Sequence, residues 1–274
     1  LLVNSGAKID APNCEIHVRS TANPAAIFNS GTSLDVSRIC VKGTRTIVNG
    51  NANPPLEMGC DAIDDPFAGQ LPTPGTGCTF NNWSPPNNVS SITMSPGVYC
   101  GWTNFNGSPA ITFQPGVYVI RNGGWNVNSG ASVTGDGVTI YFADTSKIQF
   151  NGNVTVALTA PTSGTYQGIV MYEKSGLSTS QFVFNGTNGA SFEGLIYLPS
   201  RDVTFNSVNT MVSKKQTMVF NTMIMNNTNW SFQSTSDRKM TTAGGAAMAS
   251  STRGRAGSAA RCRSAASART TPSR

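Results

Sequence analysis

The sequence contains one histidine, His17, and charged residues make up only 12% of its 274 positions. A Ser–His–acid or Cys–His catalytic group would have to use that histidine, and no G-x-S-x-G nucleophile elbow is present. The phosphate-binding P-loop and the dinucleotide-binding glycine fingerprint are missing as well. No run of about 18 apolar residues occurs, so no membrane-spanning helix is expected. These absences disfavour the common nucleotide-dependent and hydrolytic enzymes.

The cysteines lack the spacing of a metal site. There is no C-x-x-C pair, and one histidine does not complete a Cys/His zinc set, so we expect no metal and no cofactor. The body of the chain contains five of the six cysteines: Cys14, Cys40, Cys60, Cys78 and Cys100. We interpret these five as disulfide candidates of an exported protein, with buried free thiols as the alternative.

The pairing of these cysteines stays open on sequence alone. Cys14 and Cys40 are 26 positions apart, close to one repeat of the pattern described below, and would stack on neighbouring repeats. Cys60 and Cys78 would then close a loop between them. That arrangement leaves Cys100 unpaired or bonded to a residue outside this chain.

The net charge of +6 is concentrated at one end of the chain. Residues 237–274 hold eight of the 19 Lys and Arg residues and one acid, which leaves the rest nearly neutral. A body without a basic excess argues against nucleic-acid binding. The 237–274 segment has no aromatic residue and no periodicity, so it is predicted to be a disordered basic tail. It would be either an unstructured end or a basic arm for an anionic surface.

Internal repetition is the strongest pattern. Ser-Pro-Gly-Val-Tyr-Cys at 95–100 recurs as Gln-Pro-Gly-Val-Tyr-Val at 114–119. Asn-Gly and Asn-Ser-Gly pairs mark turns, many of them 21–25 positions apart, as at 106–107, 128–130 and 151–152. Between these turns lie short runs that alternate polar with small or apolar residues, as a strand with one buried face does.

The repeats predict an all-β fold, a single-stranded parallel β-helix (β-solenoid) over residues 1–236 with about ten coils. The asparagines at equivalent corners would stack into side-chain hydrogen-bond ladders. A β-sandwich or up-and-down barrel is the alternative, but its hairpin turns would recur every 8–12 residues. Residues 50–90 interrupt the pattern with many prolines and are predicted to form an inserted Pro/Cys-rich loop packed against the solenoid.

Candidate catalytic residues are few. His17 lies in an alternating run and is expected on an exposed face. Asp64 and Asp65 form the one adjacent acid pair, but neighbours on a strand point to opposite faces, and Asp65-Pro66 is more simply a turn. Glycoside cleavage needs two facing carboxylates. The other acids considered are single: Asp136, Asp144, Glu173, Glu193 and Asp202. We therefore expect no catalytic residues and no enzyme activity.

Binding is harder to judge from the sequence. Four tryptophans are candidates for stacking on sugars, although each is as readily a core residue: Trp83, Trp102, Trp125 and Trp230. Flat threonine rows would indicate an ice-binding solenoid, but the T-x-T pattern occurs only at Thr44-Arg45-Thr46. Carbohydrate binding or cleavage therefore remains an alternative function, and an ice-binding type of adhesin a weaker one.

Several stretches together resemble one bacterial family. They include Ala7–Cys14, Ser37–Gly43, Ser95–Gly101, Ala160–Ile169 and Phe192–Pro199. Over residues 4–230 this set is similar to the solenoid region of TadG-like proteins of Flp/Tad (tight adherence) pilus assembly. The five cysteines of the body match those of the family.

The resemblance implies a non-enzymatic protein of the cell envelope, located in the periplasm or at the cell surface. It implies a structural or scaffolding role in pilus assembly or surface adhesion. The expected partners are pilus-assembly or envelope proteins, with surface polysaccharide as a further candidate and no nucleic acid. Family members are usually anchored by an N-terminal transmembrane helix. This chain begins Leu1-Leu2-Val3 without one, which we interpret as a processed chain or a fragment.

Overall fold

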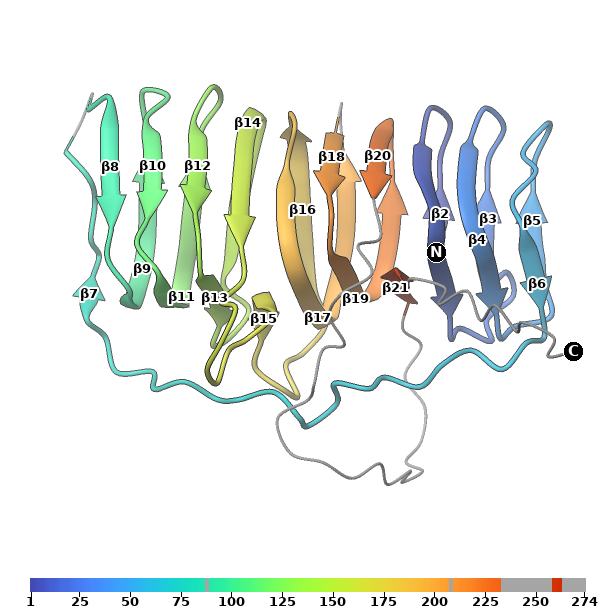
Figure 1. Cartoon of the computed structure of the whole chain (residues 1–274), viewed down its shortest axis with the longest axis horizontal. Helices are drawn as coiled ribbons and strands as arrows, with labels where there is room; N and C mark the ends of the chain where they lie inside the picture. The colour runs from blue at the N-terminus through green and yellow to red at the C-terminus, as the bar shows by residue number, and fades with distance from the viewer. Residues whose placement is uncertain (87–88, 207–208, 233–257, 263–274) are drawn as a thin grey trace, which may run out of the picture.

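The computed structural model describes residues 1–86, 89–206 and 209–232, and the backbone of 258–262. Every regular element in these residues is a β-strand, and the strands wind into a parallel β-solenoid of about 10 turns. The predicted all-β solenoid is therefore confirmed. The rod is drawn with its long axis horizontal in Figure 1.

The coils form because each short strand buries every second side chain. In β10 (Ala110–Phe113), Ile111 and Phe113 point into the core while Ala110 and Thr112 are exposed. The corners need positive φ, which glycine adopts without strain. Gly130 has a φ of 81° at the corner after Asn128.

The strands form three ladders that run along the rod. Ladder 1 comprises β7 (Phe80–Asn81), the first part of β9 (Gly97–Phe105), the first part of β11 (Gly116–Val127), β13 (Val138–Phe142), β15 (Ile169–Glu173), the middle of β17 (Ser191–Asn206), the first part of β19 (Gln216–Met225), β21 (Ser258–Cys262), the second parts of β2 (Lys8–Val18) and β4 (Ser33–Val41), and β6 (Leu56–Met58).

Ladder 2 comprises the second parts of β9 and β11, the first part of β14 (Lys147–Thr159), β16 (Ser180–Thr187), the ends of β17 and β19, β1 (Leu2–Val3), β3 (Ala26–Phe28) and β5 (Thr46–Val48). Ladder 3 comprises β8 (Ser91–Met94), β10, β12 (Ser132–Gly135), the end of β14, the start of β17, β18 (Asn209–Ser213), β20 (Thr228–Phe232), and the first parts of β2 and β4.

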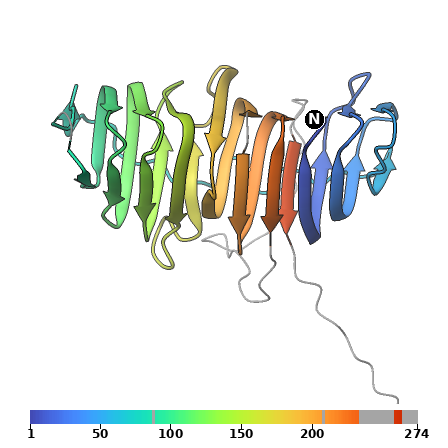
Figure 2. The ribbon, with the colours of Figure 1, turned by 90° about the horizontal axis from the view of Figure 1, so that it is seen from above.

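The coils do not follow one another in sequence order along the rod. The first coil lies in the interior of the rod, where β1 pairs with β19 and β2 pairs with β20. From there the chain proceeds to one end of the rod at β6, crosses to the other end, and returns through β7 to β20. Figure 2 shows the blue first coil beside the orange last coil. The repeat pattern predicts stacked coils, but it does not encode this split order.

Residues 59–79 form the crossing, which we call the strap. It runs beside the whole rod from β6 to β7 (Figure 1). Its roughly 20 residues reach about 70 Å when extended, and about ten strand spacings need about 48 Å. The strap is therefore long enough to span the rod without being fully extended. Within the range 50–90 predicted as a loop, β6 and β7 pair with strands of the solenoid, and the strap between them contains no strand.

A short segment of the predicted tail is assigned as a strand. Residues Ser258–Cys262 form β21, which pairs antiparallel with both β19 and β2. Composition did not predict this strand, because its pairing uses backbone groups that any sequence except proline offers. Residues 237–257 and 263–274 of the tail lie outside the described residues.

The core is a continuous stack of aromatic and aliphatic side chains inside the coils. Phe113 stacks on Trp125 with ring centroids 5.5 Å apart, and Tyr118 meets both rings edge to face. Farther along, Phe184 stacks on Phe150 and Phe205 at 5.7 and 4.8 Å. Neighbouring coils thus share one interior, as the solenoid prediction requires.

Candidate functional site

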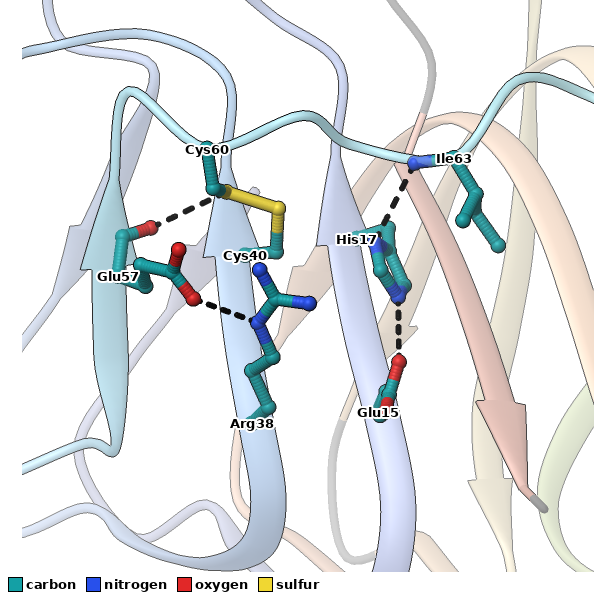
Figure 3. Close-up of a disulfide and its surroundings, with 7 residues drawn as sticks. All are labelled: Glu15, His17, Arg38, Cys40, Glu57, Cys60 and Ile63. Carbon is teal, nitrogen blue, oxygen red and sulfur yellow. Dashed lines mark hydrogen bonds and ion pairs between the residues drawn. A yellow bond between two sulfur atoms is a disulfide. The ribbon is translucent and has the colours of Figure 1, made fainter.

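Both ends of the strap are bonded covalently to the solenoid. Cys60 pairs with Cys40, with a Cα–Cα distance of 5.9 Å, and Cys78 pairs with Cys100 at 5.8 Å. Figure 3 shows the first bond beside the ion pair of Arg38 and Glu57, whose Nε and Oε2 atoms are 2.6 Å apart. Each disulfide joins a strap end to ladder 1.

The predicted pairings of Cys14 with Cys40 and of Cys60 with Cys78 are wrong, and Cys100 is not unpaired. The true separations of 20 and 22 positions each correspond to about one coil. Cys60 and Cys78 cannot meet because the strap carries them to opposite ends of the rod. Cys14 is disulfide-bonded too, so all five candidates form disulfides.

The middle of the strap covers an apolar surface on the outer side of ladder 1. Successive coils present buried side chains there, among them Val119, Tyr172 and Tyr197. Phe67 and Leu71 of the strap pack against this cluster. The rings of Phe67 and Tyr197 meet edge to face at 5.9 Å. The strap therefore buries a row of tyrosines that would otherwise face solvent.

Polar contacts fix the path of the strap. The Tyr197 hydroxyl donates to Asp65 Oδ2 at 2.8 Å, and the Tyr172 hydroxyl donates to the carbonyl oxygen of Pro72 at 2.9 Å. Arg121 Nη1 donates to the carbonyl oxygen of Thr76 at 2.6 Å. Burial raises the pKa of both tyrosines, and Asp65 raises that of Tyr197 further. The contacts come from β11, β15 and β17, of which β15 and β17 are neighbours, so the strap is attached over several coils in this half of the rod.

His17 is not exposed, contrary to the prediction. It projects outward from ladder 1 but is only 2% exposed because the strap covers it. Its Nε2 atom is 2.8 Å from Glu15 Oε2, and its Nδ1 accepts the backbone N–H of Ile63 at 3.4 Å (Figure 3). The histidine therefore joins the strap to β2.

The Asp64–Asp65 pair is structural. Asp64 Oδ1 accepts a hydrogen bond from Arg19, the residue that directly follows β2, at 2.9 Å. Asp65 caps a turn, because its Oδ1 accepts the N–H of Phe67 at 2.9 Å, as the Asp-Pro turn predicts. The two carboxylates therefore attach the strap to β2 on one side and to β17 on the other.

Glu173 forms a buried ion pair with Arg201. Both side chains are 0% exposed, and Arg201 Nε is 2.6 Å from Glu173 Oε2. The remaining Arg201 donors reach Ser180 Oγ and three backbone carbonyls, those of residues 144, 145 and 146. Burial raises the pKa of Glu173, and Arg201 opposes that shift. Sequence gave no sign of this pairing, because the two residues lie 28 positions apart on neighbouring coils.

The other acidic residues that occur singly form hydrogen bonds at corners or between neighbouring coils. Asp144 accepts from Ser146 and from the N–H of Asn122, at 2.7 Å for the latter. Burial raises the pKa of Asp144, but these hydrogen bonds outweigh it and leave the pKa below its usual value. Asp136 accepts from Thr159 at 3.0 Å, and Asp202 accepts from Thr222 at 2.8 Å.

The predicted asparagine ladders are present. One joins five coils by amide hydrogen bonds and crosses the junction between the first and last coils; its members are Asn49, Asn29, Asn4, Asn226 and Asn206. A second joins Asn151, Asn128 and Asn106. The ladders satisfy the corner amides within the rod.

Most tryptophans are unavailable for sugar stacking. Trp125 and Trp230 are 1% and 2% exposed, in the core. Trp83 packs on Tyr99 with ring centroids 5.9 Å apart. Trp102 alone of the four has an exposed side chain, at 42%, on ladder 2.

Hydroxyl and methyl groups form two short rows on the outer face of ladder 3. Pairing places successive members side by side on adjacent coils. The rows are Ser91, Ala110, Ser132 and Thr155, and Thr93, Thr112, Thr134 and Ala157. The search for T-x-T missed them because serine or alanine replaces one threonine in each strand.

Within the described residues, no three His, Cys, Asp or Glu side chains gather in a way that would hold a metal ion. No helix in the same part of the chain is long and apolar enough to cross a membrane.

A family described as "Domain of unknown function (DUF7305)" matches residues 76–250. The matched segment begins at the end of the strap and covers β7 to β20. No curated protein and no solved structure matches the chain.

Proposed function

The chain belongs to the DUF7305 family, whose function is unknown, and we propose that it is a non-enzymatic scaffold of the bacterial cell envelope. The proposed role is in Flp/Tad pilus assembly or surface adhesion. The observation that supports a scaffold is the oxidised strap, which joins both ends of a split rod and is attached along it.

The disulfides favour export. Structural disulfides persist in oxidising compartments such as the periplasm and the cell surface. Here they attach both ends of the strap to the solenoid. In a reducing cytosol these two attachments would be lost.

The engaged polar residues favour a structural role. His17, Asp64 and Asp65 hold the strap, and Glu173 is buried against Arg201. A catalytic group must reach a substrate and exchange a proton with it. These groups are committed to internal contacts instead.

A rod of this kind presents long, regular faces of backbone-paired strands to other proteins. Stacked coils and a common core resist bending, and the strap opposes separation of the two halves at their junction. We therefore assign the binding role to the outer faces and to the ends of the rod, not to a cleft.

Deletion of the gene in its source bacterium tests the proposal. Pili are counted by electron microscopy and attachment to a surface is measured. We expect both to fall and to be restored by the wild-type gene but less by a Cys40→Ser/Cys60→Ser gene. Unchanged pili and attachment in the deletion strain would overturn it.

The ladder 3 rows favour a second candidate, recognition of a flat periodic surface such as ice. The rows repeat at the strand spacing of about 4.8 Å and contain no charge. Thermal hysteresis that disappears in Thr112→Lys would support this candidate. A polysaccharide-binding panel, with Trp102→Ala as the variant, tests the carbohydrate alternative.

A further inference from the structure

The two disulfides of the strap differ in exposure. Cys40 and Cys60 are 0% and 8% exposed, so both residues of that bond are buried. In the other bond Cys100 is 5% exposed, whereas Cys78 is exposed. A thiolate that attacks a disulfide must reach one of its two sulfur atoms. Solvent access therefore favours attack at Cys78 over attack at the other three cysteines.

The strap is loosely packed where it approaches Cys78. A Cβ atom placed on Gly75 or Gly77 would contact nothing within 4 Å, so the backbone there has open space around it. The hydrogen bond from Arg121 to the carbonyl oxygen of Thr76 attaches this stretch to ladder 1. An incoming thiol therefore has room beside Cys78, and this end of the strap can move aside once its covalent bond is broken.

A guanidinium lies beside the buried half of this bond. Arg121 of β11 pairs with Cys100 of β9 in ladder 1, so their side chains leave adjacent strands at the same level, with the strands about 4.8 Å apart. Arg121 Nη1 donates to the carbonyl oxygen of Thr76, two residues before Cys78, which places the guanidinium close to the disulfide. The Nε atom of Arg121 is buried and has no hydrogen-bond partner among the described residues.

This positive charge favours departure of Cys100 from the disulfide. A nearby arginine stabilises a cysteine thiolate, and a thiol that ionises more easily is the better leaving group. The pairing neighbour of Cys100 on its other side is the uncharged Asn81. Asp144 interacts electrostatically with Arg121, but its carboxylate already accepts two backbone N–H groups. Breakage of the bond with Cys100 as the leaving group is therefore favoured by charge as well as by access to Cys78.

The environment of the other disulfide is different. Cys40 pairs with His17 on one side and with Glu57 on the other. A thiolate at Cys40 would lie beside the Glu57 carboxylate, and like charges disfavour ionisation. The guanidinium of Arg38 is already bound to Glu57 at 2.6 Å (Figure 3). Burial and charge thus both protect the bond between Cys40 and Cys60.

We propose that the bond between Cys78 and Cys100 is a thiol–disulfide exchange site, which accepts an incoming thiolate at Cys78 while Arg121 stabilises the departing Cys100 thiolate. The incoming sulfur bonds to Cys78 Sγ, and the electron pair of the original bond leaves with Cys100 Sγ, which then takes a proton from solvent. One disulfide replaces another, so the step needs no oxidant or reductant. The product carries the incoming group on Cys78 and frees this end of the strap. The proposal does not depend on the pilus assignment.

Peptide mapping after exchange tests the site. The oxidised full-length protein is incubated with reduced glutathione at about pH 8, where part of the glutathione is thiolate, and free thiols are then blocked with N-ethylmaleimide. We expect glutathione on Cys78, N-ethylmaleimide on Cys100 and an intact bond between Cys40 and Cys60. Glutathione on Cys100, or faster loss of the bond between Cys40 and Cys60, would overturn the proposal.

A second thiol distinguishes the sources of the incoming group. An unrelated protein with one surface cysteine represents a protein thiol, and glutathione represents a small one. Reaction at Cys78 with either of them supports the exchange site and assigns that source. Reaction with neither would overturn the proposal.

Arg121→Gln tests the role of the guanidinium. We expect exchange at Cys78 to slow about fivefold, because the departing Cys100 thiolate loses its neighbouring cation, whereas Arg121→Lys should keep most of the wild-type rate. If Arg121 only held the strap, loss of its hydrogen bond to Thr76 would loosen the strap and make exchange faster. Arg38→Gln, beside the buried disulfide, is the matched control and should leave the rate unchanged. An unchanged or faster rate in Arg121→Gln would overturn the proposal.

The pKa of the Cys100 thiol gives an independent readout. In full-length Cys78→Ser this thiol is free, and its ionisation is followed by the ultraviolet absorbance of the thiolate, with Cys78→Ser/Cys100→Ser as the blank. We expect a pKa below about 8.5, the value of an unperturbed thiol, and a higher pKa when Arg121→Gln is added. Equal pKa values would overturn the proposal. Circular dichroism checks the fold, and if Arg121→Gln does not fold, the glutathione map of the wild-type protein decides.

Discussion

Tyr197 and Asp65 lie 132 positions apart, yet the Tyr197 hydroxyl donates a hydrogen bond of 2.8 Å to the Asp65 carboxylate. Tyr197 belongs to β17, in the half of the solenoid built from β7 to β20, whereas the strap near Asp65 is also attached to His17 of β2 in the other half. Two neighbouring strap residues, 63 and 65, thus bridge the junction between the two halves of the rod.

Tyr197→Phe tests the bridge across the junction. The change removes the hydroxyl and keeps the ring contact with Phe67, so it isolates the hydrogen bond to the charged Asp65. We expect a loss of about 1.5–3 kcal/mol in the free energy of unfolding, measured by urea titration. Tyr166→Phe is the matched control, with an expected change below about 0.5 kcal/mol. Equal effects of the two changes would contradict the assignment.

The disulfides give a second prediction. Peptide mapping of the non-reduced protein should recover Cys40 linked to Cys60 and Cys78 linked to Cys100. Replacing either pair with serine should cost about 2–4 kcal/mol, because each bond closes a coil-sized loop of 20 or 22 positions. Recovery of a Cys60–Cys78 peptide would contradict the path of the strap.

The coil and its corners could be predicted from sequence because they depend on local patterns. Asn128 and Gly130 indicate a corner, and the repeat at 114–119 indicates a strand. The disulfide partners could not be predicted from the sequence, because several cysteines are about one coil apart. Spacing alone does not say which coils are neighbours. The split order depends on where the strap crosses, and no periodicity encodes that. The same lack of long-range information led to the exposed placement of His17.

The buried ion pair provides a third prediction. Arg201→Met leaves the Glu173 carboxylate buried without its charge partner, and we expect a loss of about 3–5 kcal/mol in the free energy of unfolding. Glu173→Gln should be destabilising as well. The double variant should lose less than the sum of the two single changes, by about 1–3 kcal/mol. Additive losses from urea titrations would show that the two side chains act independently.

The substitution Asn4→Ala tests the asparagine ladder that crosses the junction between the first and last coils. The Asn4 amide donates to Asn226 at 2.5 Å and its oxygen accepts from Asn29 at 2.7 Å, so Asn4→Ala removes one contact to the last coil and one to the second. We expect a loss of about 1–3 kcal/mol. The comparison is Asn128→Ala, which lies in the second asparagine ladder, away from the junction. Hydrogen exchange should rise at β1 and β19 in Asn4→Ala but not in Asn128→Ala, and the reverse pattern would contradict the register.

The tyrosines predict instability at alkaline pH. Burial raises the pKa of Tyr99 to about 12, and burial also raises the pKa values of Tyr172 and Tyr197. The folded state therefore favours the neutral phenols, and the unfolded chain releases their protons at about pH 10. Their contribution to stability is complete below pH 10 and is lost as the pH rises through the folded-state values. Absorbance at 295 nm should show most tyrosines ionising together with unfolding, as followed by circular dichroism. Ionisation of Tyr172 and Tyr197 near pH 10 in a protein that remains folded would show that the strap does not cover these two side chains in solution.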